Sequence, residues 1–160
     1  MEALFENHYE RTKEMFREYC GYMFFARPSM LILDVLLVLF TAAAILLGVT
    51  PGILLSPVII AAAQIYMYFY TANTMVKRDA EVTSGGTIRV DAAATEDRLL
   101  FKASNGSEQE LPYAKMKKII QTKRLILIRS EANLCYILPK DTFTKGTPEA
   151  FLAFLKEKRA

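Results

Sequence analysis

The chain has 160 residues, of which 52% are hydrophobic, and a formal net charge of +3. Its mean hydropathy of +0.18 is high for a soluble protein. The apolar residues are also pooled, because Asp34 is the only charged residue between positions 29 and 71. Since a soluble domain spreads its apolar residues periodically, this pattern excludes an ordinary soluble chain and predicts an integral membrane protein.

Residues 1–28 are predicted to form an amphipathic juxtamembrane helix. Apolar residues recur at three- and four-residue steps, and Pro28 ends the segment. The opposite face is rich in glutamate, which an anionic leaflet would repel, so we expect packing on protein rather than on lipid. The alternative is that the first few residues form an edge strand of the C-terminal domain.

Residues 29–72 are predicted to form a transmembrane helical hairpin with spans at 29–49 and 52–72. Each span supplies 21 residues, and about 20 are needed to cross roughly 30 Å of hydrocarbon. A turn made by Thr50, Pro51 and a glycine is short enough to force the two helices to be antiparallel.

Basic residues near the spans predict the orientation of the hairpin. Arg17 and Arg27 precede the first span, Lys77 and Arg78 follow the second, and the turn between them carries no charge. Because loops rich in Lys and Arg stay in the cytoplasm, both termini should be cytoplasmic. Aromatic residues gather at this same end of both spans, as in an interfacial belt.

Asp34 needs a partner, because an ionised carboxylate in hydrocarbon is costly. Gln64 and Tyr68 lie at a similar depth on the antiparallel second span, so a hydrogen bond to either one would pin the hairpin, or two hairpins in a homodimer. The alternatives are that Asp34 reaches the interface, or that it belongs to a proton or ion pathway of an oligomeric transport component.

Residues 73–160 show alternating apolar residues and are predicted to form a cytoplasmic domain. Asn105-Gly106 is the strongest hairpin signal in the chain, and Thr147-Pro148 predicts the start of a C-terminal helix. An antiparallel sheet closed by one helix gives an α+β fold and is the arrangement of a pleckstrin-homology-like β-barrel. The predicted strands are 87–92, 98–103, 108–111, 115–122, 125–129 and 134–138.

The segment from Tyr113 to Phe143 is similar to the YcxB-like family of bacterial proteins. Tyr113 stands where members carry an aromatic residue, usually Trp, and Pro139, Lys140 and Phe143 match the family's closing motif. The resemblance implies two membrane spans followed by a domain of this kind in the bacterial inner membrane. It implies no particular activity.

The sequence shows no pattern of catalytic or metal-binding residues. The single histidine, His8, has no cysteine or second histidine near it, Cys20 and Cys135 are far apart, and no phosphate-binding loop is present. We therefore predict no enzyme activity, no metal, no cofactor and no nucleic-acid partner.

One group of basic residues, called here the basic cluster, is the candidate binding surface. Near a membrane each such charge is worth about 1 kcal/mol with anionic lipid. The predicted function is a membrane-anchored interaction module that binds a protein partner or anionic lipid, and an accessory subunit of a larger membrane complex is a further alternative. The basic cluster consists of Lys115, Lys117, Lys118, Lys123, Arg124 and Lys140.

Overall fold

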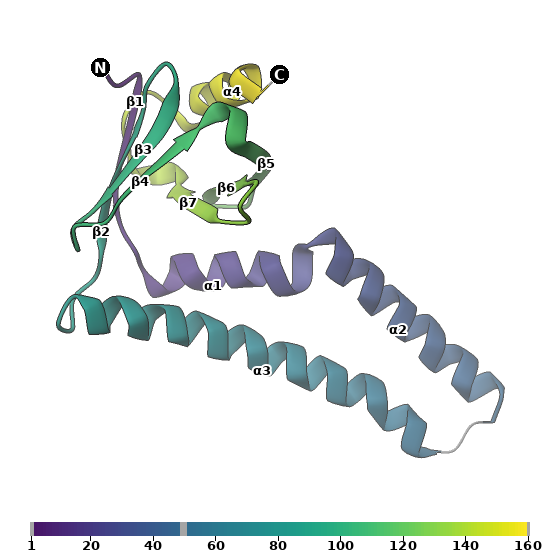
Figure 1. The fold of residues 1–160 in the computed structure, drawn as a ribbon. Helices are drawn as coiled ribbons and strands as arrows, with labels where there is room; N and C mark the ends of the chain where they lie inside the picture. Colours follow the sequence, from purple (N-terminus) through teal and green to yellow (C-terminus); the bar gives the residue numbers. More distant parts are fainter. Residues whose placement is uncertain (1, 49–50, 160) are drawn as a thin grey trace. The chain divides into compact units, whose positions relative to one another are not determined.

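The computed structural model of the chain describes residues 2–48 and 51–159, which form two compact units (Figure 1). One unit, the domain, joins the N-terminal residues up to Met15 with the residues from Lys77 onward, and the other is Phe16–Val76. The fold is α+β with two long apolar helices, as predicted, and its antiparallel strands form two sheets.

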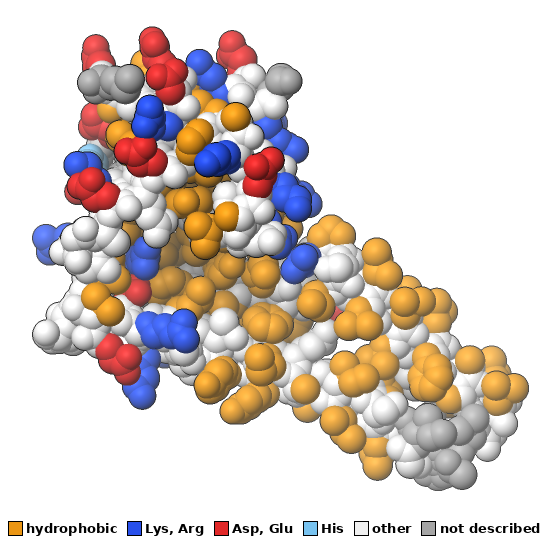
Figure 2. Space-filling model, in the orientation of Figure 1, with side chains coloured by type: hydrophobic (Ala, Val, Ile, Leu, Met, Phe, Trp, Pro, Cys, Tyr) orange, Lys and Arg blue, Asp and Glu red, His pale blue; other side chains and the backbone are white. Residues whose placement is uncertain are grey.

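Two long apolar helices make up most of the second unit. Pro28 is the first residue of one of them, a position where its missing N–H costs no hydrogen bond. Both helices are long and apolar enough to cross a membrane, and most of their side chains are exposed (Figure 2). In chain order the helices are α1 (Lys13–Gly21), the π-helix η1 (Tyr22–Ala26), α2 (Pro28–Leu46) and α3 (Pro51–Val82).

The predicted spans match α2 and α3 in position but differ at their ends. Thr50, in the predicted turn, lies outside the described residues, and Pro51 begins α3 instead of belonging to the turn. α3 continues beyond the predicted end at residue 72 because residues 73–82 contain no glycine or proline. Gly85, with a φ of +96°, ends this region, and its N–H donates to the Ala80 carbonyl at 2.7 Å.

The helix predicted across residues 1–28 is wrong for its first part. Strand β1 (Phe5–Glu10) occupies this position and lies inside a sheet, between β2 and β8. Asn7 and Tyr9 point into the protein, while His8 and Glu10 are exposed. This period of two suits a strand, and only the later residues of the segment are helical.

The strands form two antiparallel sheets. The predicted hairpin at Asn105-Gly106 is confirmed: it joins β3 to β4, and Gly106 has the positive φ, +82°, that such turns favour. The five-stranded sheet has the order β4-β3-β2-β1-β8 and the three-stranded sheet the order β5-β6-β7. The remaining strands are β2 (Arg89–Ala94), β3 (Arg98–Ala103), β4 (Glu108–Pro112), β5 (Met116–Gln121), β6 (Leu125–Ser130), β7 (Cys135–Pro139) and β8 (Phe143–Lys145).

The two sheets do not close into the predicted barrel. β4 ends at Pro112 and β7 ends at Pro139, and each is followed by a short 3-10 helix, η2 (Tyr113–Lys115) or η3 (Lys140–Thr142). Proline has no N–H to donate to a ladder, so each of these turns interrupts the hydrogen bonding where the chain passes from one sheet to the other.

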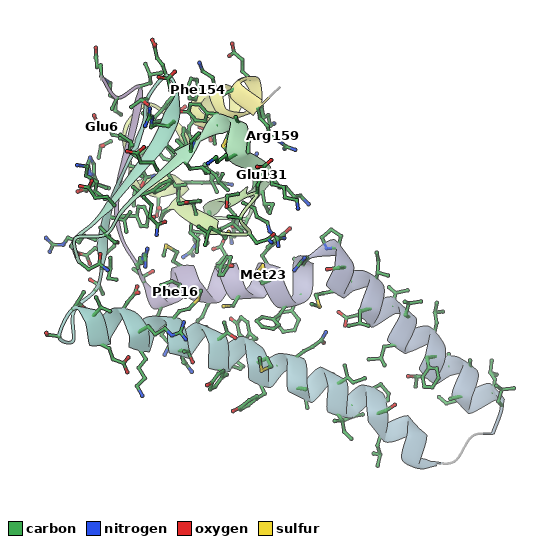
Figure 3. All side chains as sticks on the ribbon, in the orientation of Figure 1. Glu6, Phe16, Met23, Glu131, Phe154 and Arg159 are labelled. Carbon is green, nitrogen blue, oxygen red and sulfur yellow. The ribbon has the colours of Figure 1, made fainter. Side chains whose placement is uncertain are left out.

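The core of the domain lies between the two sheets and the C-terminal helix α4 (Pro148–Arg159). Phe101 of β3 stacks on Tyr136 of β7 with ring centroids 4.7 Å apart, which joins the sheets. Phe151 and Phe154 of α4 each lie 5.4 Å from the ring of Phe5. Figure 3 labels Phe154 on this helix. The predicted helix start is confirmed, because the Thr147 hydroxyl accepts from the Ala150 N–H at 3.2 Å.

Residues 11–88 are inserted between two neighbouring strands of one sheet, because β1 pairs with β2 along its whole length. Polar contacts hold the two ends of the insertion together. Glu10 accepts from Arg89 Nε at 2.9 Å and from the Thr87 hydroxyl at 3.2 Å. The Arg11 N–H donates to the Ile88 carbonyl at 2.9 Å. The domain therefore includes residues from both sides of α2 and α3.

Candidate functional site

The basic cluster lies on the three-stranded sheet and the two short helices that flank it. Lys117 and Lys118 stand at the start of β5, an edge strand, where the register with β6 shifts and leaves both side chains exposed. Lys115 precedes them in η2. Lys123 and Arg124 form the turn between β5 and β6, and both are exposed.

Basic residues of the five-stranded sheet are neutralised, unlike those of the basic cluster. All four of its Lys and Arg residues form an ion pair with a glutamate. Among the described residues no ion pair is found for Lys115, Lys117, Lys118 or Lys123. The pairs on the five-stranded sheet are Arg89–Glu10 at 2.9 Å, Arg98–Glu110 at 2.7 Å, Lys102–Glu108 at 3.0 Å and Lys145–Glu2 at 3.4 Å.

The net charge of residues 73–160 is accordingly concentrated in one segment. Residues 113–142 contain seven Lys and Arg residues and only two acidic ones, Glu131 and Asp141, a net charge of +5. The rest of residues 73–160 holds equal numbers of basic and acidic residues. Mixed red and blue side chains over the five-stranded sheet reflect this balance (Figure 2). A localised field of one sign attracts an anionic partner.

Lys140 differs from the other members of the basic cluster. Its ammonium group donates to the Thr122 carbonyl at 2.7 Å, and its backbone N–H donates to the Arg124 carbonyl at 2.8 Å. Lys140 is also less exposed than the other members. It therefore fastens η3 to the β5–β6 turn.

The other residues of the predicted family motif also have structural contacts. The Pro139 carbonyl accepts from Asn7 Nδ2 at 2.8 Å, and the Thr142 hydroxyl donates to Asn7 Oδ1 at 2.8 Å. Phe143 lies 5.2 Å from the ring of Phe151 on α4. Asn7 is fully buried. The motif thus forms the crossing from one sheet to the other, and β1 is hydrogen-bonded to that crossing.

Tyr113 closes the opposite crossing. Its hydroxyl lies 2.7 Å from the Thr95 carbonyl and 3.2 Å from the Arg98 carbonyl, and its ring lies 5.5 Å from that of Phe154. Burial, together with the nearby charge of Asp97, raises the pKa of Tyr113, so the phenol stays protonated and able to donate. Its role is to link η2, the β2–β3 turn and α4.

Asp34 and Gln64 meet between α2 and α3, where Gln64 Nε2 donates to Asp34 Oδ1 at 3.0 Å. Tyr68, the other predicted partner of Asp34, instead contacts aromatic rings. Its ring centroid lies 5.6 Å from that of Phe25 and 4.8 Å from that of Phe69. The polar pair therefore joins the two helices, and aromatic residues of the two segments meet near it.

Sequence reasoning missed Asn7 and the contacts at the ends of the insertion. The alternation of Phe5, Asn7 and Tyr9 with the polar residues Glu6, His8 and Glu10 was the signal for a strand. Asn7, a buried polar residue, also breaks the apolar pattern expected in the interior of a strand. Its side chain is hydrogen-bonded to the segment that crosses from one sheet to the other. Within the described residues no three His, Cys, Asp or Glu side chains are grouped to hold a metal ion.

Comparison with known proteins supports the family resemblance. The family model described as YcxB-like protein matches residues 94–155, from the end of β2 into α4. The predicted resemblance is thus confirmed for this segment, which contains all members of the basic cluster and all four motif residues. Neither the curated proteins nor the solved structures give a match to the chain.

Proposed function

We propose that this chain is a non-catalytic interaction module of a bacterial inner membrane. In this proposal the α2–α3 hairpin is the anchor, and the domain presents the basic cluster to an anionic partner in the cytoplasm. The observation that carries the proposal is the contrast between the two sheets: the five-stranded sheet is neutralised by ion pairs, and the three-stranded sheet holds the excess positive charge.

The exposed apolar surface of the hairpin supports anchoring in a bilayer. Large side chains such as Ile32, Val38 and Ile59 are each more than half exposed, a state that water penalises and hydrocarbon does not. Asp34 and Gln64 face each other between the helices, which is where polar groups of membrane helices belong.

Pairing of β1 with β2 supports the proposed orientation. Glu10 and Arg89 are hydrogen-bonded neighbours, so the two ends of the inserted segment must lie on the same side of any membrane. In this proposal the hairpin crosses twice, and the basic residues that flank it favour a cytoplasmic location for both ends.

Strand order supports a pleckstrin-homology-like domain. Strands β1 to β4 follow one another across one sheet, β5 to β7 across the other, and a helix comes last. In this reading the anchor is an insertion between the first two strands, β8 adds one short edge strand, and the two sheets pack without closing.

Binding of a soluble polyanion to the full chain in non-ionic detergent tests the proposal. Fluorescent poly-L-glutamate should bind the wild type at low salt and dissociate at high salt. The variant Lys117→Gln/Lys118→Gln/Lys123→Gln should bind at least tenfold more weakly, since each exposed charge contributes about 0.5–1 kcal/mol.

A matched variant separates the position of the charge from its amount. Lys156→Gln/Lys158→Gln/Arg159→Gln removes the same charge from the last turn of α4, where all three side chains are exposed. This variant should bind nearly as well as the wild type. Equal loss in both variants would show that only net charge matters, and the basic cluster would then be no site.

A further inference from the structure

One end of the basic cluster carries an exposed leucine. Leu134, in the tight turn between β6 and β7, is 54% exposed. The only other exposed large hydrophobic residues of the domain, within the part that the structure describes, are Leu4 and Val82. An apolar side chain on a loop tip beside unpaired lysines is the combination used by proteins that dock on a membrane surface.

Hydrogen bonds hold this turn in place, so the exposure of Leu134 is built into the fold. The Ser130 N–H donates to the Leu134 carbonyl at 2.9 Å, and Asn133 adopts a positive φ of +60°. Arg129 Nη2 donates to Asn133 Oδ1 at 3.0 Å. The Glu131 N–H donates to the Lys115 carbonyl at 3.0 Å, which fixes the turn against η2.

Basic side chains surround the turn. Lys118 is directly opposite Arg129 in the β5–β6 register, Lys117 precedes it, and Lys115 is bonded through its backbone to the turn. Glu131 is the acidic residue of this turn. Four basic residues and one acidic residue thus lie at this end of the three-stranded sheet.

The shape and chemistry of the basic cluster favour a surface over a single anion. The Lys117-Lys118 pair and the Lys123-Arg124 pair stand at opposite ends of β5, roughly 17–20 Å apart for a six-residue strand. One phosphate group cannot contact both. The free members are lysines, which act as mobile point charges, whereas a protein interface is centred on buried aromatic and arginine anchors.

We propose that this end of the domain docks on anionic phospholipid of the membrane that holds the hairpin, with Leu134 entering the headgroup region and Lys115, Lys117 and Lys118 contacting lipid phosphates. The inference rests on the proposed function, because the hairpin is what keeps the domain beside a bilayer. Only two residues separate β1 from α1, so the tether is short.

Because the chain contains no tryptophan, a single one can report on this contact. Leu134→Trp is placed in the full chain and reconstituted into nanodiscs of phosphatidylcholine, alone or mixed equally with phosphatidylglycerol. In the anionic discs we expect a blue-shifted emission and quenching by brominated acyl chains, both reversed by high salt. Leu4→Trp, at an exposed site just before β1, should show neither change. Identical emission of Leu134→Trp in both kinds of disc would overturn the proposal.

Charge variants in the Leu134→Trp background give the second readout. Lys115→Gln/Lys117→Gln/Lys118→Gln should lower the docked fraction about fivefold per lysine, the equivalent of about 1 kcal/mol each. Glu131→Gln should raise it. Phosphatidylserine should replace phosphatidylglycerol without loss, since the attraction is to surface charge; a requirement for one headgroup would contradict this mechanism.

The two experiments fail separately. Poly-L-glutamate binding could depend on the lysines while the emission of Leu134→Trp is unchanged by anionic lipid. In that case the basic cluster binds an acidic protein and the lipid inference is wrong. If lysine substitution affects neither polyanion binding nor the discs, the proposed function is wrong as well.

Discussion

Asn7 is the residue whose loss should damage the domain most for its size. It is 0% exposed, donates to the Pro139 carbonyl at 2.8 Å and accepts from the Thr142 hydroxyl at 2.8 Å. Asn7→Ala leaves the carbonyl without its main donor in a buried place, which costs about 1–3 kcal/mol. The Thr142 hydroxyl keeps a longer contact, 3.3 Å, to the Pro139 carbonyl, so this carbonyl loses only part of its hydrogen bonding. We expect a total of about 2–3 kcal/mol.

Urea unfolding of the full chain in detergent, followed by near-ultraviolet circular dichroism of the tyrosines, measures this cost. With a slope of about 1–3 kcal/mol per molar urea, the midpoint should fall by about 1–2 M. Glu6→Gln, one residue away and partly exposed, should change the midpoint little. If Asn7→Ala unfolds at the same urea concentration as Glu6→Gln, Asn7 does not join β1 to the sheet crossing.

Three further predictions follow from the inserted hairpin and its ends. A fragment of residues 80–160 should fail to give a dispersed amide NMR spectrum, because β2 and β8 lose the strand that lies between them, and adding residues 2–11 through a flexible linker should restore it. Reporter domains fused before residue 2 and after residue 159 should both be active only in the cytoplasm; reporters on opposite sides would contradict the β1–β2 pairing. Hydrogen bonds from Arg89 and then Thr87 lower the pKa of Glu10, so the stabilising contribution of Glu10 is present above the ordinary carboxyl range and is lost as pH falls through the lowered pKa. Glu10→Gln should therefore flatten the acid limb of a plot of unfolding free energy against pH. An unchanged acid limb would show that the pairing of Glu10 with Arg89 does not contribute.

Local chemistry explains which elements were predictable. The Asn105-Gly106 turn and the Thr147 N-cap each depend on a few neighbouring residues. α2 and α3 follow from continuous apolar runs that are long enough to be recognised in the sequence. β1 was not predictable in this way, because its spacing fits both a helix and a strand, and the partner that decides between them, β2, lies at the far end of the insertion.

The closed barrel was a wrong expectation for a related reason. Pro112 and Pro139 were visible in the sequence, but their effect depends on where each falls in a ladder. The basic cluster shows the same limit. Its lysines could be named from the sequence, yet only the structure shows that the other sheet's basic residues are each paired with a glutamate.

The α2–α3 segment and the basic cluster are attached to different sheets, so the proposed anchor and the proposed binding surface can be tested separately. The inserted segment follows β1 and precedes β2, and both strands belong to the sheet whose basic residues are paired with glutamates. The basic cluster lies on the other sheet, which connects to the first through η2 and η3. Because the Lys117, Lys118 and Lys123 side chains are exposed, their substitution should remove positive charge and leave the ladder intact. Loss of binding with unchanged stability is therefore the signature that distinguishes a functional surface from a solvated face of the sheet, and Asn7→Ala should show the opposite behaviour, with lower stability and an unaltered surface charge.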